Sequence, residues 1–103
     1  MALNLVTARP AGEPDVDRQA RLARMIENDY RLIWRLLRRL GVPAHTVDDA
    51  AQQVFLIAAE RLDDIREHSE RSFAFGTALR VAQSHRRRLG REAVSAESDH
   101  NAS

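Results

Sequence analysis

Residues 47–62 read VDDAAQQVFLIAAERL, and residues 71–88 read RSFAFGTALRVAQSHRRR. In both stretches apolar residues recur every three or four positions, which is the spacing of a helix with one buried face. Glycine and proline are almost absent from residues 15–91, and no segment alternates apolar and polar residues as a strand does. The sequence therefore predicts an all-α domain.

Three helices are expected, at residues 15–40, 46–62 and 73–89. They predict a compact three- to four-helix bundle, with four helices if the first is broken into two. The flanking residues 1–14 and 92–103 are small and polar or rich in proline and glycine. We expect a flexible lead at the N-terminus and a disordered tail, or the start of an interdomain linker, at the C-terminus.

Cap residues set the expected helix ends. Gly41 ends the first helix, because glycine accepts the left-handed conformation found there. Thr46 and Asp49 have the spacing of a capping box, and Ser72 is expected to cap the third helix. Asp29 falls inside the apolar stripe of the first helix. It is expected at the edge of that stripe with its oxygens in water, since a buried carboxylate needs an arginine or another hydrogen-bond partner.

Length and composition exclude several classes of protein. A chain of 103 residues suits one domain, and without cysteine it holds neither a disulfide nor a thiolate metal site. Its apolar runs are too short to span a bilayer, and no secretory signal opens the chain. These features favour a soluble, cytoplasmic protein without membrane insertion.

The net charge of +1 hides a segregation of charge along the chain. Residues 42–70 carry two arginines and seven acids, whereas residues 71–91 carry six arginines and no acid. All 16 basic residues are arginine, which coding bias explains best. Such charge stripes bear on partners more than the total does.

The residues give little support to catalysis. The four histidines are scattered, no paired spacing suggests a metal site, and no glycine-rich phosphate loop is present. Adjacent acids such as Asp48 and Asp49 diverge on a helix and are explained by capping and solubility. We therefore expect no enzyme, no catalytic residue, no metal, no cofactor and no small-molecule ligand.

Nucleic-acid binding has better support. The third helix combines arginines with Phe73 and Phe75, and such a mixture suits single-stranded nucleic acid. The alternative is structural, with the phenylalanines in the core and the arginines at the negative end of the helix dipole. Leu56 lies among acids and amides, where it is either an ordinary exposed leucine or an anchor for a partner helix.

Taken together, the two quoted stretches resemble region 2 of sigma-70 family sigma factors, and the extracytoplasmic-function subgroup is the most similar. Asp49, Gln52 and Phe55 meet the D-x-x-Q-x-x-F pattern, and residues 73–88 match the tract that ends in a basic cluster. The resemblance implies a domain that binds the β′ clamp helices of the RNA polymerase core. It also implies recognition of the melted −10 promoter element, held as a single non-template strand, and an anti-sigma protein as a further partner.

The resemblance assigns candidate residues to both tasks. The residues it implies for polymerase core binding are Asp49, Gln52, Gln53, Leu56 and Glu60. The segment 63–72 is implied to capture a flipped base, and the following helix to hold the strand. The residues implied for DNA binding are Asp63, Asp64, Arg66, Ser69, Arg71, Phe73, Phe75, Arg80, Ser84, Arg86, Arg87 and Arg88.

Several positions depart from the family pattern. Gln53 stands where glutamate is usual, and Arg80 and Ser84 stand where asparagine and aspartate are common. Full sigma factors continue to a second domain that reads the −35 element, so the end at Ser103 favours a shortened chain over a natural one-domain factor. Two alternatives stay open, namely a helical protein-interaction module and a dimeric regulator that binds duplex DNA.

Overall fold

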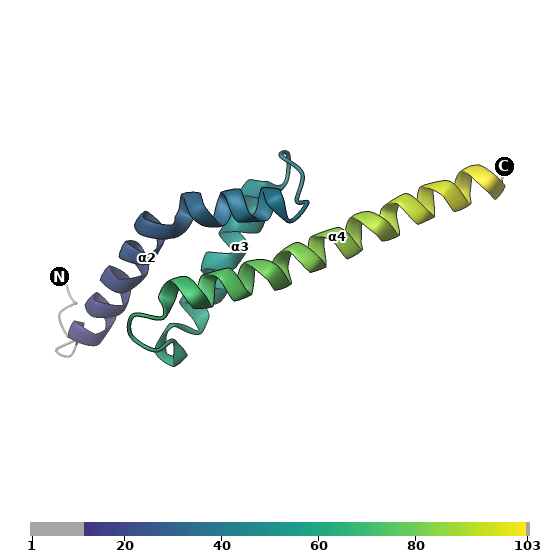
Figure 1. Cartoon of the computed structure of the whole chain (residues 1–103). Helices are drawn as coiled ribbons and strands as arrows, with labels where there is room; N and C mark the ends of the chain where they lie inside the picture. Colours follow the sequence, from purple (N-terminus) through teal and green to yellow (C-terminus); the bar gives the residue numbers. More distant parts are fainter. Residues whose placement is uncertain (1–11, 103) are drawn as a thin grey trace.

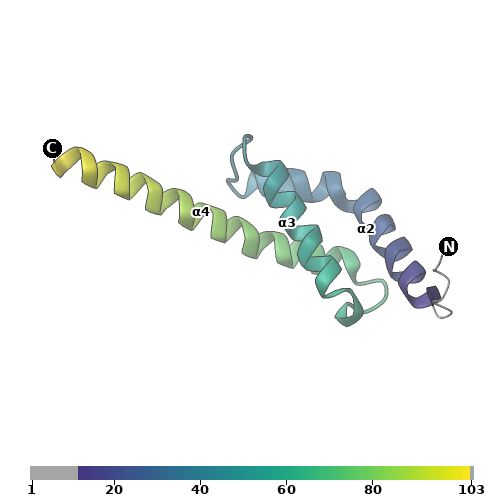
Figure 2. The ribbon, with the colours of Figure 1, turned by 180° about the vertical axis from the view of Figure 1, so that it is seen from behind.

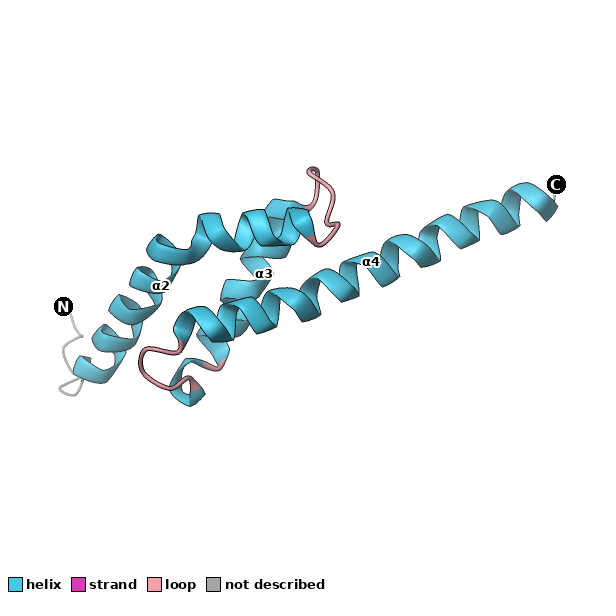
Figure 3. Cartoon of the chain, in the orientation of Figure 1, coloured by secondary structure: helices cyan, strands magenta, loops and turns pink. Residues whose placement is uncertain are grey.

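The computed structural model describes residues 12–102 and shows three α-helices (Figure 1). These are α2 (Gly12–Arg39), α3 (Val47–Glu60) and α4 (Glu70–Ala102), with a 3₁₀ turn η1 (Leu62–Asp64) between the last two. No strand occurs within the described residues (Figure 3). The prediction of an all-α fold is confirmed. No helix in this part of the chain is long and apolar enough to cross a membrane.

One core lies between the helices, since each of the three packs against the other two. α2 contributes large side chains, with Ile33 and Leu37 fully buried. α3 and α4 supply several buried alanines to this core, and such small side chains allow close approach of helix backbones. The buried alanines are Ala50, Ala51, Ala58, Ala74, Ala78 and Ala82. The opposite face of α3 is exposed along its length.

α2 ends at Arg39, and Gly41, two residues later, terminates it as predicted. This residue has φ of +100°, its N–H donates to Arg38 O at 3.1 Å, and the N–H of Val42 donates to Leu37 O at 3.0 Å. These two bonds form a Schellman motif, and both Leu37 and Val42 are buried beside it. The motif turns the chain back toward α3.

The start of α3 differs in detail from the prediction. Thr46 occupies the cap position, but its side chain makes no capping bond. Its hydroxyl instead donates to Pro43 O at 3.3 Å, so the predicted capping box with Asp49 is wrong. The tight turn from Pro43 to Thr46 draws the hydroxyl backward, and Asp49 is left on the surface.

α3 ends at Glu60, two residues earlier than expected, and the chain then forms the connection, which we define as residues 61–69. Leu62 and Ile65 are both buried and tie this otherwise polar segment to the core. His68 has φ of 70°, and Ser69 N–H donates to Arg66 O at 2.9 Å, which completes a turn directly before α4. α4 therefore begins at Glu70, and the prediction that Ser72 caps it is wrong.

The outer ends of α2 and α4 both extend further than predicted. α2 begins at Gly12, and α4 continues through the expected tail to Ala102, well past the predicted end near Leu89. No proline interrupts α4, and the alanines and glutamates after Gly90 favour a helix. Figures 1 and 2 show this part of α4 projecting beyond α2 and α3. Residues 1–11 of the predicted lead lie outside the described residues.

α2 is one unbroken helix, although it bends between its two halves (Figure 2). It therefore runs along the connection with its first half and along α4 with its second half. This arrangement lets one helix contact every segment that the resemblance implicates in function.

Candidate functional site

The five residues assigned to polymerase core binding form one exposed surface, which we call the α3 face: Asp49, Gln52, Gln53, Leu56 and Glu60. Leu56 stands out, because 60% of its surface is exposed at the centre of this polar face. A single exposed leucine is common on protein surfaces, but Leu56 also lines a groove.

That groove runs between α2 and α3 and has a volume of about 500 Å³. Asp49, Gln52 and Leu56 line it from α3, and Ile26 and Tyr30 line it from α2. Gln53 and Glu60 are exposed outside the groove. The α3 face therefore places polar groups along the border of an apolar groove, and this combination suits a partner helix.

Aromatic contacts fix the floor of this groove. Tyr30 stacks on Phe55 with ring centroids 5.9 Å apart, and Trp34 Nε1 donates to Asp48 Oδ1 at 2.9 Å. Burial and the neighbouring Asp48 carboxylate raise the pKa of Tyr30, so this phenol stays protonated at neutral pH. These contacts lock α2 against α3 and preorganise the groove.

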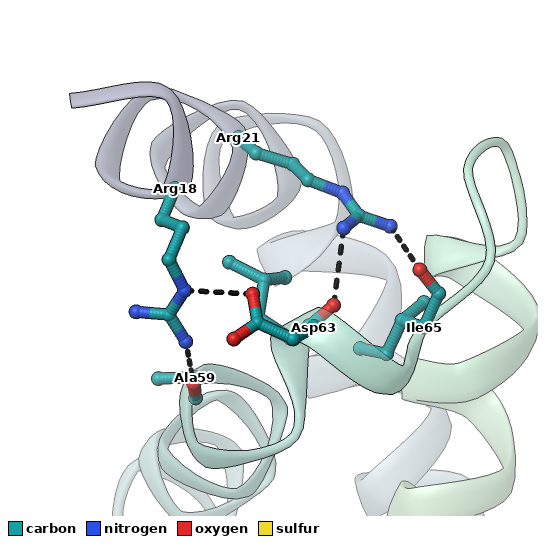
Figure 4. Close-up of polar contacts among 6 residues, drawn as sticks. Arg18, Arg21, Ala59, Asp63 and Ile65 are labelled. Atoms are coloured by element: carbon teal, nitrogen blue, oxygen red, sulfur yellow. Dashed lines mark hydrogen bonds and ion pairs between the residues drawn. The ribbon is translucent and has the colours of Figure 1, made fainter. Parts of the chain in front are cut away.

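Two arginines of α2, Arg18 and Arg21, bind the connection through hydrogen bonds, and we call this set of contacts the clasp (Figure 4). Arg21 donates to the backbone oxygens of Leu62 and Ile65, at 3.0 and 2.6 Å. Arg18 donates to Asp63 Oδ1 at 2.9 Å and to Ala59 O at 3.2 Å. Asp63, assigned to DNA binding, is therefore held in an ion pair, and the connection is a fixed loop.

Ion pairs also fix the start of α4. Arg21 Nε donates to Glu70 Oε2 at 2.7 Å, and this bond lowers the pKa of Glu70 despite an opposing effect of burial. Arg71 Nε donates to Asp29 Oδ1 at 2.8 Å. The Asp29 side chain is only 5% exposed, so its predicted placement in water was wrong, and the arginine partner satisfies it. Arg71 is thus engaged in the fold, although 58% of its side chain stays exposed.

The other DNA-binding candidates divide between exposed and structural positions. Four exposed candidates are arginines, namely Arg66, Arg80, Arg87 and Arg88. Asp64 is also exposed, and it forms an ion pair with Arg61 at 3.5 Å. Ser69 and Ser84 are half-buried.

The remaining three candidates contact α2 or the core. Phe73 packs against the hydrophobic core, while Phe75 is exposed on the side of α4 that faces α2. Arg86 reaches Leu40 O at 3.4 Å, and its Cδ lies beside Gly41. The structure therefore brings the connection and the start of α4 together, but it places Arg86 and Phe73 in packing roles.

The described side chains form no cluster of three or more histidine and acidic residues that could hold a metal ion. His85 is buried alone on the inner side of α4. Burial and the charge of Arg88 lower its pKa, against the opposing charge of Asp49, so this histidine is neutral at pH 7.

The Sigma-70 region 2 family matches residues 25–92, which are 68 of the 103 residues. The chain belongs to the sigma-70 family. The matched segment contains the second half of α2, all of α3, the connection and most of α4, so the family's region 2 is present as a folded unit. No curated protein and no solved structure matches the chain.

Region 2 of sigma factors serves transcription initiation, and this chain is a domain of that kind. The clasp made by Arg18 and Arg21 lies before the matched residues, and neither residue was singled out from the sequence. On a helical wheel both were ordinary members of a polar face. No local pattern could have singled them out, because the oxygens that they bind lie more than 40 residues further along the chain.

Proposed function

We propose that this region 2 domain is a cytoplasmic, non-catalytic initiation factor domain of the extracytoplasmic-function subgroup. It binds the RNA polymerase core through the α3 face and holds the melted −10 element on the connection and α4. The observation that carries this proposal is the family match over residues 25–92, which covers both surfaces.

Core binding is argued from the shape and chemistry of the α3 face. Leu56 projects beside the groove between α2 and α3, where a helix of the β′ clamp would bury it. Gln52 and Asp49 border the groove and supply hydrogen-bonding groups around that contact. Gln53 carries no charge where the family usually has glutamate, which makes this face less acidic. An anti-sigma protein that covered the same groove would compete with the core.

Core binding is tested by retention of the purified chain on immobilised core polymerase. Leu56→Arg places a charge in the buried contact, and Gln52→Ala removes a hydrogen-bonding group, so both should reduce retention, the first by about tenfold or more. Leu79→Arg is the matched control, because Leu79 is also an exposed leucine but lies on α4. Equal retention of all three variants would overturn the proposed docking mode.

DNA binding is argued from the charge and rigidity of the second surface. Arg66, Arg80, Arg87 and Arg88 are exposed on the connection and α4, and arginine neutralises phosphates. The clasp by Arg18 and Arg21 holds the connection in one conformation, which lowers the entropy lost when a base is captured. A fixed loop beside a basic helix suits an unpaired strand.

The test compares a single-stranded −10 sequence with the same sequence as a duplex, at low salt and with core polymerase present. We expect tighter binding of the single strand. In Arg87→Gln and Arg88→Gln, the dependence of log K on log salt should become shallower by about 0.7 for each phosphate that the variant no longer neutralises. Preference for the duplex would instead favour a groove-reading regulator, and no DNA binding would favour a protein-interaction module.

A further inference from the structure

The groove between α2 and α3 has an apolar wall on α2 that lies outside the five residues assigned to core binding. Leu22, Ile26 and Tyr30 form this wall. Ile26 is 36% exposed, and Leu56, which lines the groove from α3, is 60% exposed. Exposed apolar side chains that gather in one hollow mark interaction sites more often than singly exposed ones do. The wall therefore suits an apolar segment laid along α2.

The chain itself supplies such a segment before α2. Residues 2–8 read ALNLVTA, and we call them the leading segment. They contain no charged side chain, although 30% of the residues in the whole chain are charged. Leu3 and Leu5 are two positions apart, so an extended backbone projects them to one side and Asn4 to the other. The leading segment can therefore present an apolar edge to a groove and a polar edge to water.

The length of chain before α2 is sufficient to reach the groove. Ile26 lies 14 residues after Gly12, the first residue of α2, which is about 21 Å along the helix axis. Leu5 lies seven residues before Gly12, and an extended chain of that length spans about 23 Å. Docking requires the chain to reverse at the start of α2, where Pro10 and Gly12 are residue types common in turns. Leu5 can therefore reach the level of Ile26.

Attachment to α2 favours the leading segment over a separate molecule as the occupant. A short tether gives an effective concentration in the millimolar range, so a contact with a Kd of about 1 mM forms in roughly half of the molecules or more. Closing so short a loop costs less entropy than bringing two molecules together. Asp48 and Asp49 are the charged residues of the groove lining, and the leading segment has no carboxylate for them to repel.

We propose that the leading segment docks in the groove between α2 and α3 and covers it in the free protein. Leu3 and Leu5 pack against the apolar wall of α2 and against Leu56, while Asn4 faces water. The same groove is the proposed contact for the polymerase core, so the docked segment is an internal competitor that the core displaces. This competition rests on the proposed function, whereas the docking itself does not.

The experiment is disulfide trapping in the full chain, which contains no cysteine of its own. Thr7→Cys is combined with Ala59→Cys, because Ala59 lines the groove and lies beside Arg18, within reach of residue 7. The matched control combines Thr7→Cys with Ala20→Cys, since Ala20 is an exposed alanine at a similar height on α2 but lines a different hollow, beside Glu70. Mass spectrometry follows disulfide formation in a glutathione buffer. We expect the pair at 7 and 59 to react about tenfold faster than the control pair.

Further substitutions in the trapped pair test which side chains hold the leading segment. Leu3→Ser and Leu5→Ser each remove an apolar contact and should slow disulfide formation at 7 and 59 by about fivefold or more. Asn4→Ser is the matched control, because it alters a polar residue of the same segment and should leave the rate unchanged. None of the three should change the rate of the pair at 7 and 20, where no docking is involved.

The outcomes separate this inference from the proposed function. Equal rates for the two cysteine pairs, or equal rates with and without Leu3→Ser and Leu5→Ser, would overturn the docking. Disulfides formed mainly between two chains would also overturn it and assign the groove to a second copy. If docking is supported, the trapped chain should lose retention on immobilised core polymerase by about tenfold or more and regain it with a reductant. Full retention of the trapped chain would refute the proposed core contact and leave the docking intact.

Discussion

Removal of Arg71 should destabilise this domain much more than removal of its partner. The Nε of Arg71 lies 2.8 Å from Asp29 Oδ1, and the two side chains differ sharply in exposure, at 58% and 5%. Arg71→Ala leaves a buried carboxylate without its partner, whereas Asp29→Ala returns a guanidinium that is already half in water to full hydration. Both substitutions remove the same ion pair, but they should lower the unfolding free energy by unequal amounts.

The expected cost of Arg71→Ala is about 2–3 kcal/mol of unfolding free energy, below that of a fully buried pair because the arginine is solvated. Asp29→Ala should cost about 1 kcal/mol or less. For a domain of this size the first corresponds to a fall in Tm of roughly 8–24 °C. The double variant should recover most of the loss, because it contains no unpaired buried charge.

Urea and thermal unfolding, followed by circular dichroism, measure these differences. Arg66→Ala is the control, since this exposed arginine should change stability by no more than about 0.5 kcal/mol. Equal losses in Arg71→Ala and Asp29→Ala, or strictly additive losses in the double variant, would refute the reasoning that burial of Asp29 sets the cost.

Three further predictions concern the turns, the clasp and pH. Gly41→Ala should lower the unfolding free energy by about 1–2 kcal/mol in urea titrations, because φ is +100° and the new Cβ meets Arg86 Cδ at 3.2 Å. Arg21→Gln should raise amide hydrogen exchange in the connection by about tenfold or more, since the variant cannot form the three hydrogen bonds of the guanidinium. The lowered pKa of His85 means that the unfolded state takes up a proton first, so stability should fall as pH drops below 6.5, and His85→Gln should flatten this fall in thermal melts.

Helix periodicity was sufficient to predict the fold class and most of the core. Val54, Phe55 and Ala58 of α3 are buried as their spacing requires, and Leu56 is exposed as it requires. Gly41 also predicted the end of α2, because its left-handed conformation is a local property. The capping box predicted from Thr46 and Asp49 does not form, because the Thr46 hydroxyl donates to the carbonyl of Pro43 instead.

Long-range polar contacts could not be predicted from periodicity. Arg21 lies more than 40 residues from the oxygens it binds, and nothing in its own neighbourhood distinguishes it from Arg24 on the same polar face. The connection is polar in sequence, yet it is anchored by Ile65, whose burial depends on how α2 passes over it. The candidate DNA-binding surface therefore contains residues, such as Arg71, whose contacts within the fold only the tertiary structure shows.

The most direct test of the central claim is site-specific crosslinking to the polymerase core. A photoreactive residue in place of Leu56 should label the β′ clamp helices, because the proposal places this side chain inside the contact. The same group in place of Leu79 should leave these helices unlabelled. Labelling of β′ from position 79 but not from position 56, or from neither position while the chain still binds the core, would contradict the proposed docking of the α3 face.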